Sequence, residues 1–303
     1  MFRYVIKRVS LALVSILIIS LITFFTMNAI PGGPFNSEKA LSPTAKKALE
    51  ERFNLDKPKT EQYFIYMKNM LKGDFGISTK NGRDISSIIK ESFSLSAKLG
   101  GMAALVALIG GVLLGSLAAL TRNKLPDRLI IFFTTLAAAV PSFVLATLLL
   151  LLFCIKLGWF DVWNANSTNY ILPVISLALY PLAYITRLTK TSMLDVLGQD
   201  YVRTAKAKGV MPWKMIFKHS LRNAILPVVT YMGPMIAYII CGSLVVESVF
   251  TLGGLGSKFV TCITNRDYPM IMGTTMFLSI IMVTMSLICD LIYKVVDPRI
   301  TFD

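Results

Sequence analysis

The chain has 303 residues, of which 54% are hydrophobic and only 16% are charged, and its formal net charge is +14. A soluble domain carries about 25% charged residues, so this composition excludes an ordinary water-soluble enzyme. The single histidine excludes a multi-histidine metal site and a histidine proton relay. The four cysteines show no C-x-x-C spacing, and we interpret them as small hydrophobic residues rather than as disulfides or metal ligands.

Six apolar segments are each close to the ~20 residues that a helix needs to cross a bilayer. The first is longer than the apolar part of a signal peptide and no A-x-A site follows it, so we expect an uncleaved span. The fourth is short and contains two prolines, which membrane helices tolerate when neighbouring helices satisfy the freed carbonyls. The pattern predicts an all-α membrane protein with six transmembrane helices packed as a bundle. The segments are about 9–30, 99–120, 129–155, 170–188, 224–250 and 270–293.

The basic residues of the short connections fall mainly on one side of these spans, whereas the long segment 31–91 has eleven basic and eight acidic residues and is of the kind that largely escapes the charge rule. Cytoplasmic loops carry an excess of lysine and arginine, so this distribution predicts that both termini lie in the cytoplasm. It also accounts for the positive charge without nucleic-acid binding. The loop 158–169, which would lie outside, has no basic residue. The basic residues expected inside include Arg3, Lys7, Arg8, Arg122, Lys124, Arg128, Arg203, Lys206, Lys208, Lys214, Lys218, Arg222, Lys294 and Arg299.

Residues 31–95 would then lie outside the membrane, and their pattern is that of a folded insertion. Ser42-Pro43 has the form of an N-cap followed by the first position of a helix, which would run toward Phe53. Apolar side chains recur at helical spacing over 62–71 and predict a second helix. Gly73-Asp74-Phe75-Gly76 predicts a turn.

The segment 200–227 is basic and lies between the fourth and fifth spans, so it must lie at a membrane face. Gly209 is expected to end one helix in the left-handed conformation, and Pro212 to start another. The second helix is amphipathic, with Trp213, Ile216, Phe217 and Leu221 on its apolar face. A helix lying in the lipid interface is the alternative. Small residues leave room for a protein partner just before the glycine: Thr204, Ala205 and Ala207.

Residues Arg203–Gly209 read R-T-A-K-A-K-G, and Ile225-Leu226-Pro227 closes the segment. This order resembles the cytoplasmic loop of ABC importer permeases, in the form typical of the peptide-importer branch. The general signature begins with Glu-Ala-Ala, and Arg203-Thr204-Ala205 stands in those places here. Further blocks are similar, in order, to the dipeptide, oligopeptide and nickel permease family: Ala29–Phe35, Gly73–Gly76, Ser96–Gly100, Glu247–Phe250, Gly253–Gly256, Asn265–Pro269 and Asp297–Arg299.

The resemblance implies a B-type permease subunit with the type I ABC importer fold, nearest to the oligopeptide branch. It implies a first helix over 1–30, an extracellular insertion over 31–95 and a core permease domain over 96–303, with a coupling loop at about 193–223. The implied setting is the bacterial cytoplasmic membrane, with a second homologous permease subunit, two cytoplasmic ATPase subunits that hold ATP and Mg, and an extracellular or periplasmic peptide-binding protein. This chain would bind no cofactor and catalyse no reaction. The residues implied in ATPase coupling are Arg203, Thr204, Ala205, Ala207, Lys208, Gly209, Pro212, Trp213 and Phe217.

Prolines suggest where a path for cargo could run. Pro141-Ser142, and Pro227 with Pro234, predict breaks in the third and fifth spans, and broken helices often line cavities. Arg187 and Lys190 lie at the inner end of the fourth span, where long basic side chains can reach the interface. The candidate pathway residues are Pro141, Ser142, Tyr231, Pro234 and Glu247.

Two glycine patterns have a structural interpretation. Gly111 and Gly115 form a GxxxG pair that permits close helix packing. Residues Gly253–Lys258 lack the order of a phosphate-binding loop, and we expect a tight turn there.

Three alternatives stay open at this point. The first is an importer of the same class for dipeptides or nickel, which no feature of the sequence separates from an oligopeptide importer. The second is an ion channel or ion-coupled carrier, which would need charged or carbonyl-lined sites at mid-membrane, where these spans carry few charges. The third is an intramembrane enzyme, which would need paired catalytic groups.

Overall fold

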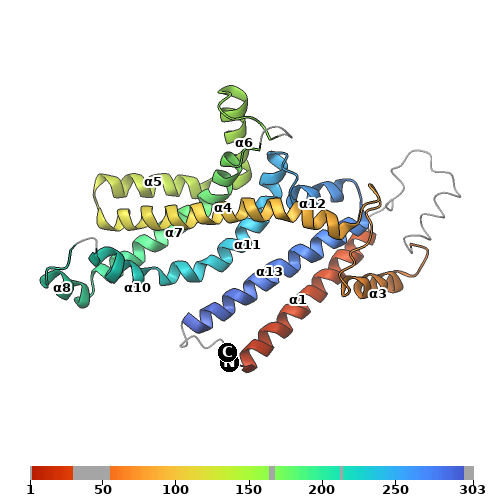
Figure 1. Ribbon diagram of the computed structural model, residues 1–303, viewed down its shortest axis with the longest axis horizontal. Helices are drawn as coiled ribbons and strands as arrows, with labels where there is room; N and C mark the ends of the chain where they lie inside the picture. The colour runs from red at the N-terminus through yellow and green to blue at the C-terminus, as the bar shows by residue number, and fades with distance from the viewer. Residues whose placement is uncertain (1, 30–54, 164–167, 212–213, 297–303) are drawn as a thin grey trace. The chain divides into compact units, whose positions relative to one another are not determined.

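The computed structural model describes residues 2–29, 55–163, 168–211 and 214–296, and the described chain is almost entirely helical (Figure 1). It divides into two compact units, one formed by residues 1–95 with 253–287 and the other by residues 96–252 with 288–303. The helix expected from Ser42 toward Phe53 lies outside the described residues.

The first unit contains α1 (Phe2–Ala29), α3 (Lys59–Met70), the start of α4 (Ile85–Leu120), α12 (Leu255–Thr264) and most of α13 (Tyr268–Val296). Helix α3 confirms the helix expected over 62–71. The glycine-flanked turn that follows is confirmed as well, because its two glycines have φ of 81° and 85°.

Helices α1, α3 and α13 share one apolar cluster. Its buried members are Phe24 and Met27 of α1, Tyr63 of α3, and Tyr268 and Met272 of α13. The Tyr63 hydroxyl also lies 2.7 Å from the hydroxyl of Ser20. The first apolar span is therefore tied to the insertion that follows it by both packing and a hydrogen bond.

Helix α12 corrects the tight turn expected over Gly253–Lys258. Gly254 is the N-cap of a ten-residue helix, whose Leu255 and Cys262 are buried in a cluster with Ile85 and Met270. Burial of this apolar face against α4 and α13 stabilises a helix that local sequence alone does not predict. Burial also raises the pKa of the Cys262 thiol to about 12, so it stays protonated and unreactive, as expected for a cysteine that serves as a small hydrophobic residue.

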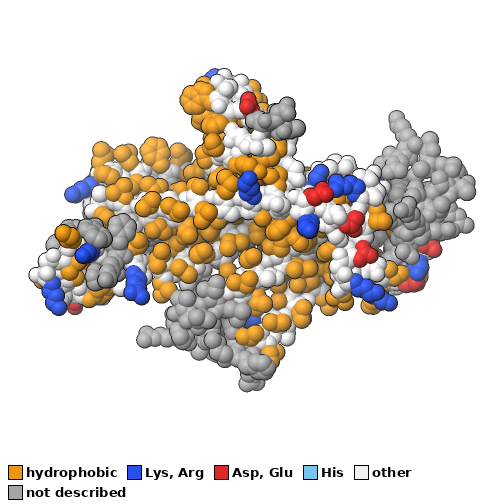
Figure 2. Space-filling view, in the orientation of Figure 1, with side chains coloured by type: hydrophobic (Ala, Val, Ile, Leu, Met, Phe, Trp, Pro, Cys, Tyr) orange, Lys and Arg blue, Asp and Glu red, His pale blue; other side chains and the backbone are white. Residues whose placement is uncertain are grey.

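The second unit contains α5 (Leu125–Ala139), α6 (Ser142–Leu149), the π-helical segment η1 (Leu150–Lys156), α7 (Ile171–Leu197) and α11 (Leu226–Val249). Many hydrophobic side chains of α5, α6 and η1 are exposed, among them Phe132, Phe133 and Leu148, and Figure 2 shows a large orange surface. Such surfaces are typical of helices that face lipid or other membrane helices.

The predicted break at Pro141-Ser142 is confirmed, because α5 and the helix from Ser142 to Lys156 are bent by 101° relative to one another. Val140 has the extended backbone that a following proline favours. The third apolar segment is thus a bent pair and not one straight helix. The fifth span is also bent, by 40° between Ile240 and Ser243, and Pro227 lies in the first turn of α11. Pro234 lies inside α11 without ending it, so the break is not at Pro234. Counting each bent pair as one span, the described chain has up to six candidate membrane spans.

Helix α7 extends nine residues beyond the predicted end of the fourth span at Leu188. Pro181 is buried inside it, and α7 packs against α5, α6 and α11. Neighbouring helices thus compensate for the proline, as they do in other membrane bundles.

Two glycines let α4 approach α7 closely. A Cβ atom added at Gly111 would lie 2.6 Å from Ile185 Cγ2, and one added at Gly115 would lie 2.5 Å from the carbonyl oxygen of Thr186. The packing role expected for this GxxxG pair is therefore confirmed.

Replacing Gly115 with valine is expected to destabilise the second unit by about 1–3 kcal/mol, since a rigid backbone carbonyl must move to make room. Equilibrium unfolding in detergent micelles measures the effect. The control is Gly101→Val on the same helix, because nothing lies within 4 Å of a Cβ at Gly101. Equal stability of the two variants would contradict the close packing.

Candidate functional site: the basic segment and a tyrosine-lined face

The basic segment folds as α8 (Asp200–Ala207), a π-helical segment η2 (Met215–Leu221) and a single turn, α10 (Arg222–Ala224). Gly209 has φ of 74°, which confirms the left-handed conformation expected there. The N–H of Val210 donates to the carbonyl oxygen of Ala205 at 3.2 Å and closes the end of α8.

The second helix of this segment differs from the expected α-helix, because η2 has the wider π-helical hydrogen-bond pattern. Its apolar residues Ile216 and Leu221 pack on a buried cluster formed by Ala119 of α4, Met193 of α7 and Ala224. This face is therefore covered by the protein's own helices, which does not favour the alternative of a helix lying in lipid. Pro212 and Trp213 lie outside the described residues, as does the side chain of Phe217.

A hydrogen bond joins the two halves of the basic segment. The Asn223 amide donates to the hydroxyl of Tyr201 at 2.8 Å, and Val202 of α8 is buried. The segment is thus one folded piece supported by the ends of α4 and α7.

The outer side of this piece is basic and built of small residues. Lys and Arg side chains gather around α8 in Figure 2. Arg203 lies 3.6 Å from Asp200 in an exposed ion pair, which contributes little to stability. Of the sequence-predicted coupling residues, the exposed ones are Arg203, Thr204, Ala207, Lys208 and Gly209, and Ala205 is half-buried.

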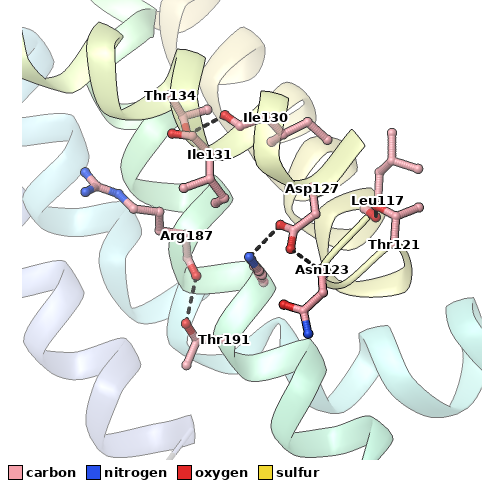
Figure 3. A network of polar contacts seen from close by, with 10 residues as sticks. Leu117, Thr121, Asn123, Asp127, Ile130, Ile131, Thr134, Arg187 and Thr191 are labelled. Atoms are coloured by element: carbon pink, nitrogen blue, oxygen red, sulfur yellow. Dashed lines mark hydrogen bonds and ion pairs between the residues drawn. The ribbon is translucent and has the colours of Figure 1, made fainter. Parts of the chain in front are cut away.

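A buried ion pair links α5 to α7 in the second unit. The Lys190 ammonium donates to Asp127 at 2.5 Å, and the N–H of Asn123 donates to the other carboxylate oxygen at 2.9 Å (Figure 3). Lys190, which was expected to extend toward the interface, binds Asp127 of α5. The 63 residues that separate the two partners explain why local pattern did not reveal the pair.

Four tyrosines meet between α7 and α11. The rings of Tyr180 and Tyr238 stack with centroids 4.7 Å apart, and those of Tyr184 and Tyr231 with centroids 4.2 Å apart. Ser142, at the start of α6, lies beside the Tyr238 side chain. Aromatic rings, phenol hydroxyls and a helix break thus form one face of the second unit.

The predicted pathway residues fall in different environments. Ser142 and Tyr231 belong to the tyrosine-lined face and are half-buried. Pro141 and Pro234 are exposed, whereas Glu247 is completely buried in α11. Sequence reasoning missed the other three tyrosines. Their spacing was a usable signal, because residues four apart or seven apart lie on one side of a helix.

In the first unit, Asp267 fixes part of the insertion. It accepts hydrogen bonds from the hydroxyl of Ser78, from the N–H of Thr79 at 3.1 Å and from the Thr79 hydroxyl at 3.0 Å. A bridge between Ile77 and Asp84 closes the loop that carries these donors. This clamp gives a structural reason for the aspartate in the block Asn265–Pro269.

Comparison with known families adds an independent finding. Residues 111–302 match the family described as binding-protein-dependent transport system inner membrane component, and residues 1–99 match the N-terminal region described for the same systems. Together these matches cover most of the chain.

Three relatives match over essentially their full length. The dipeptide transport system permease protein DppB of Bacillus subtilis is 44% identical over 99% of this chain and 98% of that protein. The oligopeptide transport system permease proteins OppB of Haemophilus influenzae and Escherichia coli K12 are 40% and 37% identical, each over 100% of both chains.

Two solved structures share the fold. One is a crystal structure of an amino acid ABC transporter, with a TM-score of 0.54 at 15% identity over 69% of this chain and 94% of that chain. The other is the inward-facing MetNI methionine ABC transporter, with a TM-score of 0.54 at 14% identity over 69% of this chain and 96% of that chain. The fold, the full-length relatives and the two profile matches agree, and the chain belongs to the family of binding-protein-dependent transport system inner membrane components.

Proposed function

We propose that this chain is the permease subunit of an ATP-driven peptide importer in a bacterial cytoplasmic membrane. Family membership and full-length relatives named for dipeptide and oligopeptide transport carry this proposal. The cargo class is peptides, with oligopeptides as the first candidate because of the Pro-Gly-Gly-Pro-Phe block at 31–35. Dipeptides are the second candidate, favoured by the 44% identity to the Bacillus subtilis protein.

The proposed complex contains a second homologous permease subunit, two cytoplasmic ATPase subunits and a peptide-binding protein outside the membrane. ATP and Mg would be bound by the ATPase subunits. Both termini of this chain would lie in the cytoplasm, because the basic connections then fall on the cytoplasmic side. The insertion at 31–95 would face the binding protein, and residues 96–303 would form the core permease domain.

The basic segment at about 193–223 is proposed to dock on an ATPase subunit. Its exposed side offers small residues and a left-handed glycine, while its apolar side packs on α4 and α7. A displacement by the ATPase would therefore be transmitted to those two helices. The proposed coupling residues are Arg203, Thr204, Ala205, Ala207, Lys208, Gly209, Pro212, Trp213 and Phe217.

The cargo path is proposed to run along the tyrosine-lined face of the second unit, which would form half of the translocation pathway. Ser142 and Tyr231 support this, because both lie where α6, α7 and α11 meet. Pro141 and Pro234 are exposed beside them. Glu247 is buried in this conformation and would contact cargo only in another state of an alternating-access cycle.

Co-purification tests the assignment most directly. Tagged chain extracted in mild detergent should recover two ATPase subunits and a second permease, and the complex in vesicles should take up peptide only with ATP and binding protein. If the purified chain alone moved solute down an ion gradient without nucleotide, the proposal would be wrong.

A further inference from the structure

One polar stripe runs along the exposed side of α7. Tyr180, Tyr184, Arg187 and Thr191 follow one another at spacings of four, three and four residues, so they share one face of the helix. Tyr184 has 41% of its surface exposed, and Arg187 and Thr191 are exposed as well. Tyr180 and Tyr184 lie within the predicted fourth span, Arg187 lies at its inner end, and Thr191 lies beyond its end at Leu188.

Arg187 differs from the other basic residue on this part of α7. Lys190 is bound to Asp127, whereas the Arg187 side chain points away from Asp127 in Figure 3. Across the described ranges, Arg187 has no acidic group within 4.0 Å. Arginine in a membrane span is costly unless it faces a partner, a water-filled cavity or the interface.

The tyrosines of α11 lie farther from the end of their helix than tyrosines that anchor a span at the membrane interface. Tyr231 lies about 8 Å from the start of α11 and Tyr238 about 18 Å from it, at 1.5 Å per residue. Tyrosines are enriched at the edges of a hydrocarbon core that is ~30 Å thick, not at its middle. The pair formed by Tyr180 and Tyr238 would therefore lie near the middle of the span, where lipid offers phenol hydroxyls no hydrogen-bond partner.

We propose that this face binds the carboxylate of the peptide cargo, with Arg187 as the anion-binding residue and the tyrosine pairs leading to it from mid-membrane. The inference rests on the proposed function. A guanidinium presents a planar fork of donors that matches a carboxylate. Phenol hydroxyls supply further donors, and the stacked rings offer flat apolar surface to a peptide.

The alternative occupant of Arg187 is a lipid phosphate. A lipid phosphate would explain one arginine near the end of a span, but it would not explain the two stacked tyrosine pairs on the same face. A cargo path accounts for all of these groups together, because cargo requires polar contacts along its whole passage.

The test uses the complete complex in vesicles and two forms of one peptide, with a free C-terminal carboxylate and with a C-terminal amide. The wild-type complex should take up the free acid faster. Arg187→Gln should lower the ratio of acid to amide uptake about five- to tenfold, as expected for one lost charge-assisted contact. Arg187→Lys should keep part of the preference, because the positive charge stays.

The matched control is Arg128→Gln, which removes an exposed arginine of α5 that is not on the stripe and should leave the ratio unchanged. Variants are compared at equal amounts of assembled complex. An unchanged ratio in Arg187→Gln would overturn the inference. The inference would also be overturned if Arg187→Gln lowered uptake of both peptides equally and only in vesicles with anionic lipid, because Arg187 would then bind lipid phosphate. Failure of the wild-type complex to take up either peptide would overturn the proposed function itself.

Discussion

Replacing Gly209 with proline is expected to lower the amount of peptide imported per ATP hydrolysed roughly tenfold or more, while the subunits still assemble. Gly209 has φ of 74°, which proline with φ near −65° cannot adopt. The backbone after α8 must then adopt another conformation at the place where the segment would dock on the ATPase. The free energy that couples two sites is typically 1–3 kcal/mol, so losing the coupling between ATPase and permease should change the uptake per ATP by a large factor. Ala205→Glu should act in the same direction by adding bulk and charge to the docking face.

Uptake and ATP hydrolysis are measured together in vesicles that contain the complete complex. Gly158→Pro is the matched control, because Gly158 also has a left-handed backbone, with φ of 61°, and nothing within 4 Å of an added Cβ. It lies in the loop between η1 and α7, away from the basic segment. Normal uptake per ATP in both Gly209→Pro and Ala205→Glu would rule out the proposed docking role.

Replacing Asp127 with alanine is expected to destabilise the second unit by on the order of 3 kcal/mol, because the Lys190 charge loses its buried partner. The Lys190 side chain retains 21% exposure and can recover some hydration, which places the effect at the lower end for broken buried pairs. The N–H of Asn123 also loses its acceptor. Equilibrium unfolding in detergent micelles gives the free-energy difference.

A double variant separates the ion pair from simple packing. Asp127→Leu with Lys190→Leu removes both charges and should be markedly more stable than Asp127→Ala, since a buried pair can often be replaced by apolar residues at little cost. Asp195→Ala is the control, because this carboxylate of α7 is exposed. If Asp127→Ala and Asp195→Ala unfolded alike, the pair would contribute nothing to the packing of α5 on α7.

The basic segment shows what sequence reasoning can and cannot supply. The left-handed backbone of Gly209 was predictable because it depends on a few neighbouring residues and on the absence of a Cβ atom. The π-helical pattern of η2 was not, because its apolar residues satisfy an α-helical spacing equally well. Residues of η2 pack against Ala119 of α4 and Met193 of α7, and the sequence of the segment itself does not contain these contacts.

The tyrosine-lined face was likewise predictable only in part. Tyr231 was selected from the sequence, but the partner of its ring, Tyr184, lies on another helix. Arg187 and Lys190 look equivalent as two basic residues near the end of one span. Only the position of Asp127 on α5 separates them, since it binds Lys190 and leaves Arg187 on the exposed stripe.

The sequence by itself determined that this is a helical membrane protein of the importer family, where its apolar segments lie, which glycines permit close packing and where the helix at Pro141 breaks. These properties follow from composition, local backbone limits and the order of short blocks. Only the tertiary structure decided which polar groups meet, including Asp127 with Lys190 and the two tyrosine pairs. Such contacts depend on how helices far apart in the chain pack together, and the local periodicity of the sequence does not predict that packing.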